Sequence, residues 1–311
     1  MSDEATVDVS VVISCYFEEQ SIDEFYTRLS KTLEAMGRPY EILFVNDGST
    51  DKTFDRLKAI FDADPHVTAI VDFFSNAGQG NAKTPGVLLA RGKAIALIDS
   101  DLQLDPEELP LLMEKFDEGY DIVSGYRKER RDSLLRVLPS LLANKIMRKA
   151  SKSNLRDFGC TFKLYDRRLV QAFDFGPFKP WRPVPVIAMA GRIAEVPVSH
   201  HPRKYGKSGW TFRRLFAYNM ENLVNLSDRP FQLIGGACLF LALLFVARIA
   251  LARFLPRAFV PEATIGLALN AIAVTFLTLL AVLCAVGEFV VRSFGMLQAR
   301  PAYAIREIHT R

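Results

Sequence analysis

One pattern recurs four times in the N-terminal part of the chain: a short apolar, β-branched run is followed by a stretch with helical periodicity. The apolar runs lie at residues 7–13, 41–45, 67–73 and 93–98. Parallel strands need a crossover connection, and a helix usually supplies it. The pattern therefore predicts an α/β domain with a mostly parallel sheet and flanking helices.

Two of the predicted helices begin with capping signals. Ser21 followed by Glu24 matches a capping box. Asp105 stands where it would cap a second helix, with Pro106 at the first helical position and Glu108 placed to complete the cap. The turn before this second helix is therefore predicted to be fixed from both sides.

Two long apolar segments lie in the C-terminal third of the chain, at residues 233–251 and 263–285. Each is close to the roughly 20 residues that span a bilayer, which predicts a transmembrane hairpin. A buried hairpin inside a soluble protein is the alternative. Arginines are more numerous on the two outer flanks than at the connecting turn, which favours cytoplasmic ends.

Residues 211–226 carry apolar side chains at helical spacing. Periodicity alone fits a helix on a membrane surface and a helix packed on the sheet equally, and the apolar residues that follow favour the membrane. We therefore predict four regions: a soluble domain, an interfacial helix, two transmembrane helices and a cytoplasmic tail, at residues 1–210, 211–230, 231–288 and 289–311.

The N-terminus is acidic and is followed by a strand pattern, so no cleaved signal sequence is predicted. We expect a multi-pass protein of the inner (plasma) membrane with its soluble domain in the cytoplasm. The net charge of +4 is too small to indicate nucleic-acid binding, and the basic residues cluster locally, which favours small anion sites. The four cysteines show no CxxC spacing, so neither zinc nor a disulfide framework is indicated.

An acidic turn follows the fourth apolar run: Asp99-Ser-Asp101-Leu-Gln103. Two carboxylates at i and i+2, placed where a strand ends, can converge on Mg²⁺ or Mn²⁺ and leave positions open for diphosphate oxygens. A solvated turn is the alternative, because two aspartates at this spacing are common in loops. The strand before the turn and the helix after it favour the metal site, with a nucleotide as the ligand.

A second turn, Asn46-Asp47-Gly48-Ser49, also follows a predicted strand. Gly48 allows the backbone to approach a planar ligand, and Asp47 can accept a hydrogen bond from the imide N–H of uracil or from a ribose hydroxyl. A plain turn with Asp51 as the helix cap is the alternative, and both can hold. Ligands bind beyond the carboxyl ends of parallel strands, so these turns and the one at residues 15–18 should face one crevice.

The order of motifs along the chain resembles glycosyltransferase family 2. The motifs are Val-Val-Ile-Ser-Cys-Tyr-Phe-Glu-Glu at 11–19, Asn-Asp-Gly-Ser-Thr-Asp at 46–51, Asn-Ala-Gly-Gln at 76–79, Ala-Arg-Gly at 90–92, Asp-Ser-Asp-Leu-Gln at 99–103 and Gly-Tyr-Arg at 125–127. More narrowly, the chain resembles polyprenyl-phosphate glycosyltransferases, which include dolichyl-phosphate mannose synthases and bacterial undecaprenyl-phosphate glucosyl and aminoarabinose transferases. The motifs of this second resemblance are Asp-Phe-Gly-Cys-Thr-Phe-Lys-Leu-Tyr at 157–165, Arg-Lys-Tyr-Gly-Lys-Ser at 203–208, the apolar hairpin, Gly-Glu-Phe from 287 and Ala-Arg-Pro-Ala-Tyr from 299.

The resemblance implies a GT-A type α/β fold and an inverting transfer of a sugar from a nucleotide sugar, a UDP-sugar by expectation, to the phosphate of a polyprenyl phosphate. The product would serve the modification of an envelope glycan such as lipopolysaccharide. The resemblance also implies a homo-oligomer, a tetramer by analogy. Transfer to a hydroxyl lipid and an inactive nucleotide-sugar-binding scaffold are the alternative functions.

The resemblance also implies roles for individual residues. Those expected to bind the nucleotide sugar are Tyr16, Glu18, Asn46, Asp47, Asp99 and Ser100. Those expected at the metal ion, Mg²⁺ or Mn²⁺, are Asp99, Asp101 and Gln103. Those expected to gather the phosphates of donor or acceptor are Arg127, Arg131, Lys163 and Arg203. Catalysis is expected to involve Asp101, Arg127 and Asp157, the last of which orients the sugar or a phosphate-binding arginine.

The chain departs from the family pattern at two places. Ser14-Cys15 stands where a proline usually precedes the tyrosine of the first motif, and Phe17 replaces the common asparagine. Contacts to the base are expected to differ accordingly. Pro85 lies where the family usually has a smooth helix, so we expect a helix that starts late or kinks.

Overall fold

The computed structural model describes residues 7–127, 148, 151, 153–205, 240 and 301–311, with isolated positions between 272 and 293. The chain divides into two compact units, Met1–Leu226 with Pro301–Arg311, and Ser227–Arg300. The predicted interfacial helix, the predicted transmembrane helices apart from the isolated positions, and Arg131 lie outside the described residues. No helix in the described parts combines the length and the apolar character needed to cross a membrane.

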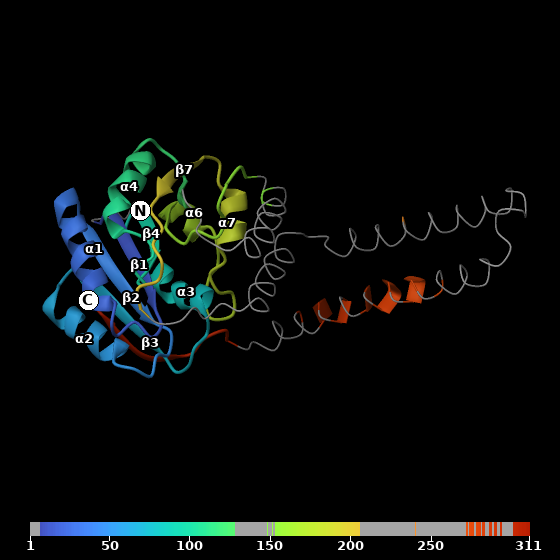
Figure 1. Ribbon diagram of the computed structural model, residues 1–311, viewed down its shortest axis with the longest axis horizontal. Coiled ribbons are helices and arrows are strands. Elements are labelled where there is room, and N and C mark those ends of the chain that lie inside the picture. The colour runs from blue at the N-terminus through green and yellow to red at the C-terminus, as the bar shows by residue number, and fades with distance from the viewer. Residues whose placement is uncertain are drawn as a thin grey trace, which may run out of the picture. The chain divides into compact units, whose positions relative to one another are not determined.

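The first unit contains an eight-stranded sheet in the order β7-β5-β6-β4-β1-β2-β3-β8 (Figure 1). The strands are β1 (Val9–Cys15), β2 (Tyr40–Asn46), β3 (Val67–Phe73), β4 (Ala94–Asp99), β5 (Ile122–Arg127), β6 (Lys163–Asp166), β7 (Ile193–Val198) and β8 (Ile305–Thr310). Four neighbouring pairs are parallel, namely β1 with β2, β1 with β4, β2 with β3 and β5 with β7. Strands β6 and β8 pair antiparallel with their neighbours. The mostly parallel sheet is thus confirmed.

Helices cover both faces of the sheet, and they are α1 (Ile22–Met36), α2 (Thr53–Ala63), α3 (Gln79–Leu89), α4 (Leu109–Asp117), α6 (Arg167–Gln171) and α7 (Pro183–Met189). Alternate residues of β1 show how the strands serve both layers, because Ile13 packs in the core with α1 and α2 whereas Val12 packs with α3 and α7. Strands buried on both faces read as continuous apolar runs, which explains why the sequence pattern located them.

Helix α3 begins at Gln79 and continues through Pro85 to Leu89, so of the two outcomes predicted for this segment the late start is wrong. The helix packs closely on β1 because Gly86 carries no side chain. A Cβ atom at this position would lie 2.3 Å from Cγ1 of Val12, well inside van der Waals contact. The position of α3 matters for function because it brings Lys83 toward the carboxyl end of β4.

Ser21 and Asp105 occupy the predicted N-cap positions, but the predicted side-chain cap hydrogen bonds are absent. The side chain of Ser21 makes no cap hydrogen bond and instead donates to the carboxylate of Glu18. Asp105 makes none either, and α4 is preceded by a short 3-10 turn, Pro106–Glu108. The acidic side chains bind other groups instead. Asp105 accepts a hydrogen bond from Arg28 at 2.6 Å, and Glu108 accepts one from the main-chain N–H of Ser199. The carboxylates therefore make their charge-assisted hydrogen bonds with groups that lie far away in the sequence.

Candidate functional site

The turns after β1, β2 and β4 meet at one edge of the sheet, as predicted. In the strand register Cys15 lies opposite Asn46, and Ser14 lies opposite Asp99. Two hydrogen bonds tie the first two turns together, from the N–H of Asp47 to the carbonyl of Cys15 and from the N–H of Phe17 to Oγ of Ser49. The residues that the sequence pattern singled out are therefore neighbours in space.

Asp99, the first carboxylate of the acidic turn, is paired with a lysine that the sequence analysis did not single out. Nζ of Lys83 lies 3.0 Å from Oδ1 of Asp99, and the two side chains are only 7% and 16% exposed. Burial opposes the charged form of Asp99, but the Lys83 ammonium keeps its pKa below the ordinary value. Asp99 is therefore an ionised carboxylate that is already paired with a cation.

Asp101, the second carboxylate, meets a cation from a distant part of the chain. Nη2 of Arg203 donates to Oδ2 of Asp101 at 2.8 Å, and the N–H of Gln103 donates to Oδ1 at 3.2 Å. Burial raises the pKa of Asp101, and the neighbouring Asp99 raises it further, against the influence of Arg203. The fold therefore brings Arg203 beside the acidic turn.

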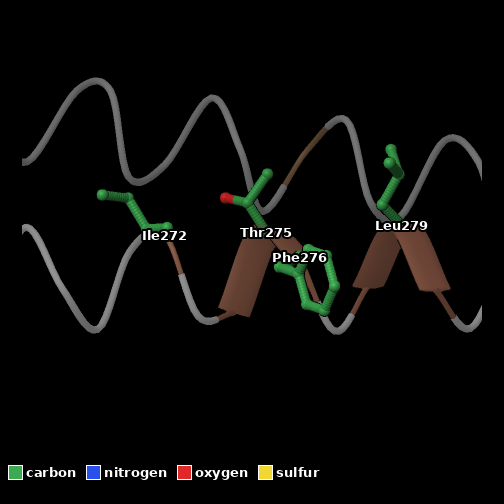
Figure 2. A pocket seen from close by; sticks show the side chains of 4 residues that line it. All are labelled: Ile272, Thr275, Phe276 and Leu279. Carbon is green, nitrogen blue, oxygen red and sulfur yellow. The ribbon is translucent and has the colours of Figure 1, made fainter.

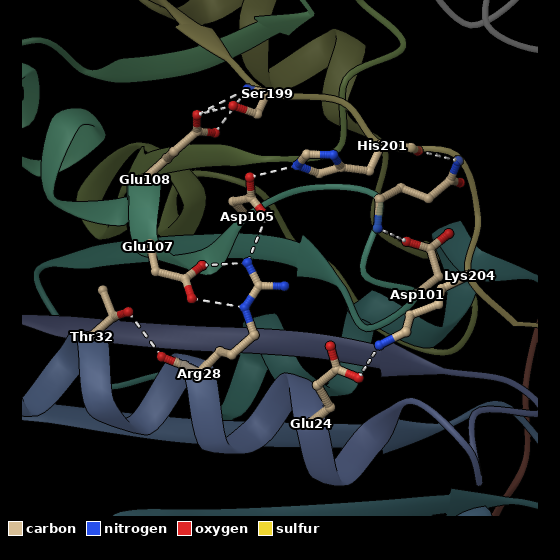
Figure 3. Close-up of polar contacts among 11 residues, drawn as sticks. Glu24, Arg28, Thr32, Asp101, Asp105, Glu107, Glu108, Ser199, His201 and Lys204 are labelled. Carbon is tan, nitrogen blue, oxygen red and sulfur yellow. Dashed lines mark hydrogen bonds and ion pairs between the residues drawn. The ribbon is translucent and has the colours of Figure 1, made fainter.

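The segment after β7 is held along the acidic turn by several polar contacts, many of which Figure 3 shows. Its contacts run from His201 to Asp105 at 2.7 Å, from the N–H of His201 to the carbonyl of Gln103 at 2.9 Å, and from Lys204 to Glu24 of α1 at 2.7 Å. The amide of Gln103 in turn donates to the carbonyl of His201 at 3.3 Å. These contacts fix the position of the segment that carries Arg203. The role of Gln103 as a metal ligand stays a prediction.

The donor set at the acidic turn suits a hard divalent cation. Glu18, Asp99 and Asp101 place negative charge in one region, since Asp101 and Asp99 both raise the pKa of Glu18. Within the described residues no group of three or more histidine, cysteine, aspartate or glutamate side chains forms a closed metal cage. Mg²⁺ sites that act on phosphates need no such cage, because one or two carboxylates hold the ion and the phosphates supply further oxygens. Asp101 fits that arrangement.

The carboxylate of Glu18 titrates near neutral pH. Burial is the main cause, and the charge of Asp101 adds to it, so that the pKa rises from 4.5 to about 7 despite the hydrogen bond from Ser21. A carboxyl with a raised pKa in the folded state stabilises the fold fully below its ordinary pKa. That contribution is lost as the pH rises through about 7.

We therefore expect the melting temperature of the metal-free wild type to fall, relative to that of Glu18→Gln, as the pH is raised from about 5 to about 8. Glutamine carries no charge to desolvate, so the variant lacks this titration. Differential scanning calorimetry of both proteins across this range measures the effect. Melting curves that stay parallel at every pH would contradict the assignment.

Asp47 holds the loop that leads into α3. Its carboxylate accepts from the N–H groups of Ala77 at 2.7 Å and Gly78 at 3.0 Å, and from the side chain of Asn76 at 3.0 Å. Burial raises its pKa to about 6, against the effect of the two main-chain donors. The loop that Asp47 orders lies at the edge of the sheet where the turns after β1, β2 and β4 meet. A contact between Asp47 and a nucleoside stays a prediction.

Gly48 is required by the protein backbone itself, and its predicted role of admitting a planar ligand stays a prediction. The residue has φ +68°, and a Cβ atom would lie 2.4 Å from the carbonyl carbon of Ser75. The close approach is thus between the turn after β2 and the turn after β3. Only glycine combines this conformation with this contact.

The remaining nucleotide-site residues differ in exposure. Tyr16 and Phe17 are 43% and 49% exposed, and their rings meet edge to face with centroids 4.5 Å apart. Phe17 has φ +57°, an uncommon conformation for a residue with a side chain, of the kind that clusters at functional sites. Asn46 and Ser100 are buried. The two aromatic rings are therefore the accessible surfaces of this group, whereas Asn46 and Ser100 shape the site from beneath.

Arg127 and Asp157 form a two-point ion pair. Nε of Arg127 donates to Oδ2 of Asp157 at 2.7 Å, and Nη2 donates to Oδ1 at 3.0 Å. Oδ1 also accepts from the N–H of Gly159. This geometry agrees with the prediction that Asp157 orients an arginine.

Lys163 is buried in the core at the start of β6. Its ammonium donates to the carbonyl oxygens of Cys160 and, at 3.4 Å, Phe158. Burial lowers its pKa below the ordinary value. A contribution of Lys163 to an anion site stays a prediction, because these contacts hold it to the loop before β6.

Comparison with known proteins identifies relatives across most of the chain. The profile described as Glycosyl transferase family 2 matches residues 10–173. Two proteins named undecaprenyl-phosphate 4-deoxy-4-formamido-L-arabinose transferase are each 32% identical to this chain. The one from Shewanella sediminis (strain HAW-EB3) aligns over 96% of this chain and 92% of its own length, and the one from Enterobacter sp. (strain 638) over 99% and 95%.

Solved structures share the fold of the first unit. Glucosyl-3-phosphoglycerate synthase from Mycobacterium tuberculosis, solved with Mn²⁺, UDP and glucosyl-3-phosphoglycerate, superposes with a TM-score of 0.52 at 19% identity, over 71% of this chain and 80% of that one. TarS from S. aureus, solved with UDP-GlcNAc, superposes with a TM-score of 0.50 at 18% identity, over 71% and 66%. At these identities the likeness concerns the GT-A type α/β fold alone.

Proposed function

The chain belongs to glycosyltransferase family 2, and from that premise we propose that it transfers a sugar from a nucleotide sugar to a phosphate oxygen of a polyprenyl phosphate. Relatives at 32% identity over nearly the full length are named as undecaprenyl-phosphate sugar transferases, which supports this acceptor. The chain is thus a glycosyltransferase, and the nature of its acceptor explains the charges of its site.

The observation that carries this proposal is the engagement of Asp157 by Arg127. A sugar or lipid hydroxyl must lose a proton to attack, so a transferase acting on a hydroxyl needs a carboxylate that is free to accept it. Both oxygens of Asp157 are instead held by the guanidinium of Arg127. A phosphate monoester has its second pKa at about 6 and is already ionised near neutral pH. Such an acceptor needs a cation rather than a base.

The bonds and charges of the reaction balance without proton transfer. A bond forms between an acceptor phosphate oxygen and the anomeric carbon, and the bond from that carbon to the nucleoside diphosphate breaks. The electron pair leaves with the diphosphate, and attack from the opposite side inverts the configuration. The work of the site is therefore to position two anions and to stabilise the charge that develops on the leaving group.

The donor end of the site would be formed by the acidic turn. Asp101, with Asp99 beside it, would hold Mg²⁺ or Mn²⁺, which as a Lewis acid neutralises the charge that develops on a departing diphosphate. The Lys83 ammonium keeps Asp99 charged and fixed. Tyr16 and Asp47 would meet the nucleoside at the same edge, with the buried Asn46 beneath them.

Arg127 and Arg203 are proposed to bind the acceptor phosphate. Arg127 is fixed by Asp157, so its guanidinium is oriented before an anion arrives. Arg203 pairs with Asp101, and we expect it to exchange this partner for a phosphate oxygen of the acceptor. Preorganised cations of this kind cost little reorganisation during the reaction.

The second unit is proposed to contact the membrane. Figure 2 shows Ile272, Thr275, Phe276 and Leu279 on one helical stretch. Ile272, Phe276 and Leu279 are each about two-thirds exposed, at 66%, 64% and 68%. Exposed apolar residues in such a concentration mark an interaction surface, and a lipid acceptor makes the bilayer the partner of matching chemistry.

The course of the chain supports a hairpin within that unit. The first unit contains both the residues that precede residue 227 and those that follow residue 300. Both ends of the second unit are therefore tied to the same folded body, which permits only an even number of bilayer crossings. This agrees with the predicted pair of transmembrane helices. We propose an inner-membrane protein with a cytoplasmic catalytic unit, while the homo-oligomer and the UDP donor stay predictions.

The test is a reconstituted reaction with purified full-length protein, undecaprenyl phosphate, Mg²⁺ or Mn²⁺ and a panel of UDP-sugars. Both the released nucleoside diphosphate and the lipid-linked sugar are measured. We expect metal-dependent formation of both in equal amounts with one donor. Nucleotide binding without turnover across the panel would favour the inactive scaffold instead.

A further inference from the structure

The C-terminal residues return to the catalytic unit as an edge strand. Strand β8 pairs antiparallel with β3, and in Figure 1 it is drawn in red at the C-terminal end. The preceding Tyr303 is buried and stacks on Phe73, with ring centroids 4.8 Å apart. Residues that follow the second unit thus complete the sheet beside the turns of the donor site.

Arg306 of β8 provides a charge partner for a buried carboxylate. Its Nη1 lies 2.9 Å from Oδ2 of Asp72, which is only 1% exposed. Burying an unpaired carboxylate is costly, so the contact with Arg306 holds the Asp72 side chain in place.

From Asp72 a chain of hydrogen bonds runs to the first two turns of the site. Asn46 donates from Nδ2 to Oδ1 of Asp72 at 2.7 Å, and Ser49 donates to Oδ1 of Asn46 at 2.5 Å. Oγ of Ser49 then accepts from the main-chain N–H of Phe17 at 3.1 Å. Each bond donates toward the carboxylate, so the orientation of every member depends on the charge at Asp72.

Arg306 also holds the exit of β3. Nη2 donates to the carbonyl of Phe74 at 3.0 Å, and the N–H of Phe74 donates to the carbonyl of Ala304 at 3.1 Å. The chain then continues into the loop whose N–H groups bind Asp47. One guanidinium thus supports both Asn46 and the loop that Asp47 orders.

We propose that Arg306 is a positioning residue for the donor site, and that the C-terminal strand completes this site only after the chain has returned from the second unit. The proposal rests on the proposed function, in which Tyr16 and Asp47 receive the nucleoside and Asn46 supports them from beneath. It adds a dependence of nucleotide binding on residues that follow the membrane-contacting segment. A chain that fails to return across residues 227–300 would lack an ordered donor site.

The test compares two arginines of the C-terminal segment in the full-length protein, Arg306 within β8 and Arg311 directly after it. Arg306→Gln removes the partner of Asp72, whereas Arg311→Gln removes an anchor at the other end of the strand, which donates to the carbonyl oxygens of Phe61 and Asp64. Titration calorimetry with UDP measures the Kd, and steady-state kinetics separate the KM of the donor from that of undecaprenyl phosphate. Arg311→Gln is the matched control because it weakens the attachment of the strand but leaves the hydrogen-bond chain from Asp72 to Phe17 intact.

We expect Arg306→Gln to weaken UDP binding and to raise the donor KM by about tenfold or more, with the acceptor KM unchanged. Arg311→Gln should leave all three constants near the wild-type values. Arg306→Lys should recover part of the affinity because it restores the charge. The double variant Asp72→Asn/Arg306→Gln should recover more than Arg306→Gln, because no buried charge is left without a partner.

The double variant also keeps the test informative if Arg306→Gln fails to fold. Equal effects of Arg306→Gln and Arg311→Gln on donor affinity, or a wild-type Kd in Arg306→Gln, would overturn the positioning role. The same result follows if the acceptor KM rises as much as the donor KM. If the wild type itself binds no nucleoside diphosphate, the proposed function fails and this inference fails with it.

Discussion

Asp101→Asn is expected to lower kcat by about 100-fold or more, because the variant removes the charge that would hold the divalent cation against the departing diphosphate. The carboxamide has nearly the same shape, and it can still accept from the N–H of Gln103. The fold should therefore survive while turnover is lost. Lipid-linked sugar formed per unit time at saturating donor and metal measures the effect.

Glu107→Gln is the matched control for this prediction. Glu107 follows the same turn and is paired with Arg28 of α1, but it is half exposed and stands away from the Asp101–Arg203 pair. We expect its activity to stay within about twofold of wild type, since exposed ion pairs contribute little. A small effect of Asp101→Asn, or equal effects of the two variants, would show that Asp101 does not hold the metal.

Lys83→Met is expected to destabilise the protein by about 3–5 kcal/mol, because it leaves the buried carboxylate of Asp99 without its cation. Methionine fills most of the volume of the lysine stem, so the loss reports charge rather than a cavity. Urea unfolding followed by circular dichroism measures the free energy. The change should appear in the midpoint of unfolding with the slope unchanged.

The double variant Lys83→Met/Asp99→Asn separates charge from packing. Once both charges are gone, we expect most of the lost stability to return, whereas activity should stay low because Asp99 belongs to the proposed donor site. Additive losses in the double variant would mean that the two side chains are not coupled. The account would then have no explanation for a lysine buried in α3.

Strands β1 to β4 could be predicted from sequence because each is buried on both faces. The run at residues 67–73 coincides with β3, and the run at 41–45 lies within Tyr40–Asn46. The same pattern predicted that the turns of the site lie close together, because parallel strands bring their carboxyl ends to one edge of the sheet. Local apolar runs and the common direction of parallel strands are sufficient to predict both features.

Pairings between distant charges could not be predicted. Arg203 is 102 residues from Asp101, and Arg28 is 77 residues from Asp105. A capping rule considers only residues within one helical turn. It therefore assigned the Asp105 side chain to a cap hydrogen bond, whereas that side chain pairs with the guanidinium of Arg28 on α1. Lys83 was overlooked for the same reason, because nothing near it in sequence indicates burial against Asp99.

Strand β8 was predicted only as a tail. Its β-branched residues Ile305, Ile308 and Thr310 were a signal, but a single short strand cannot be paired by pattern alone. The contact of Gly48 with the backbone of Ser75, in the next turn of the sheet, could not be predicted from the sequence either. In both cases the sequence does not indicate which distant segment packs against the strand or the turn.

The acceptor group tests the account most directly. The purified protein is given the productive donor and metal with either undecaprenyl phosphate or undecaprenol, two lipids that differ only in the phosphate, and the products are identified by mass spectrometry. The account predicts a phosphate-linked monosaccharide from undecaprenyl phosphate and no product from undecaprenol. Sugar attached to undecaprenol, with none on undecaprenyl phosphate, would contradict it and point to transfer onto a hydroxyl lipid.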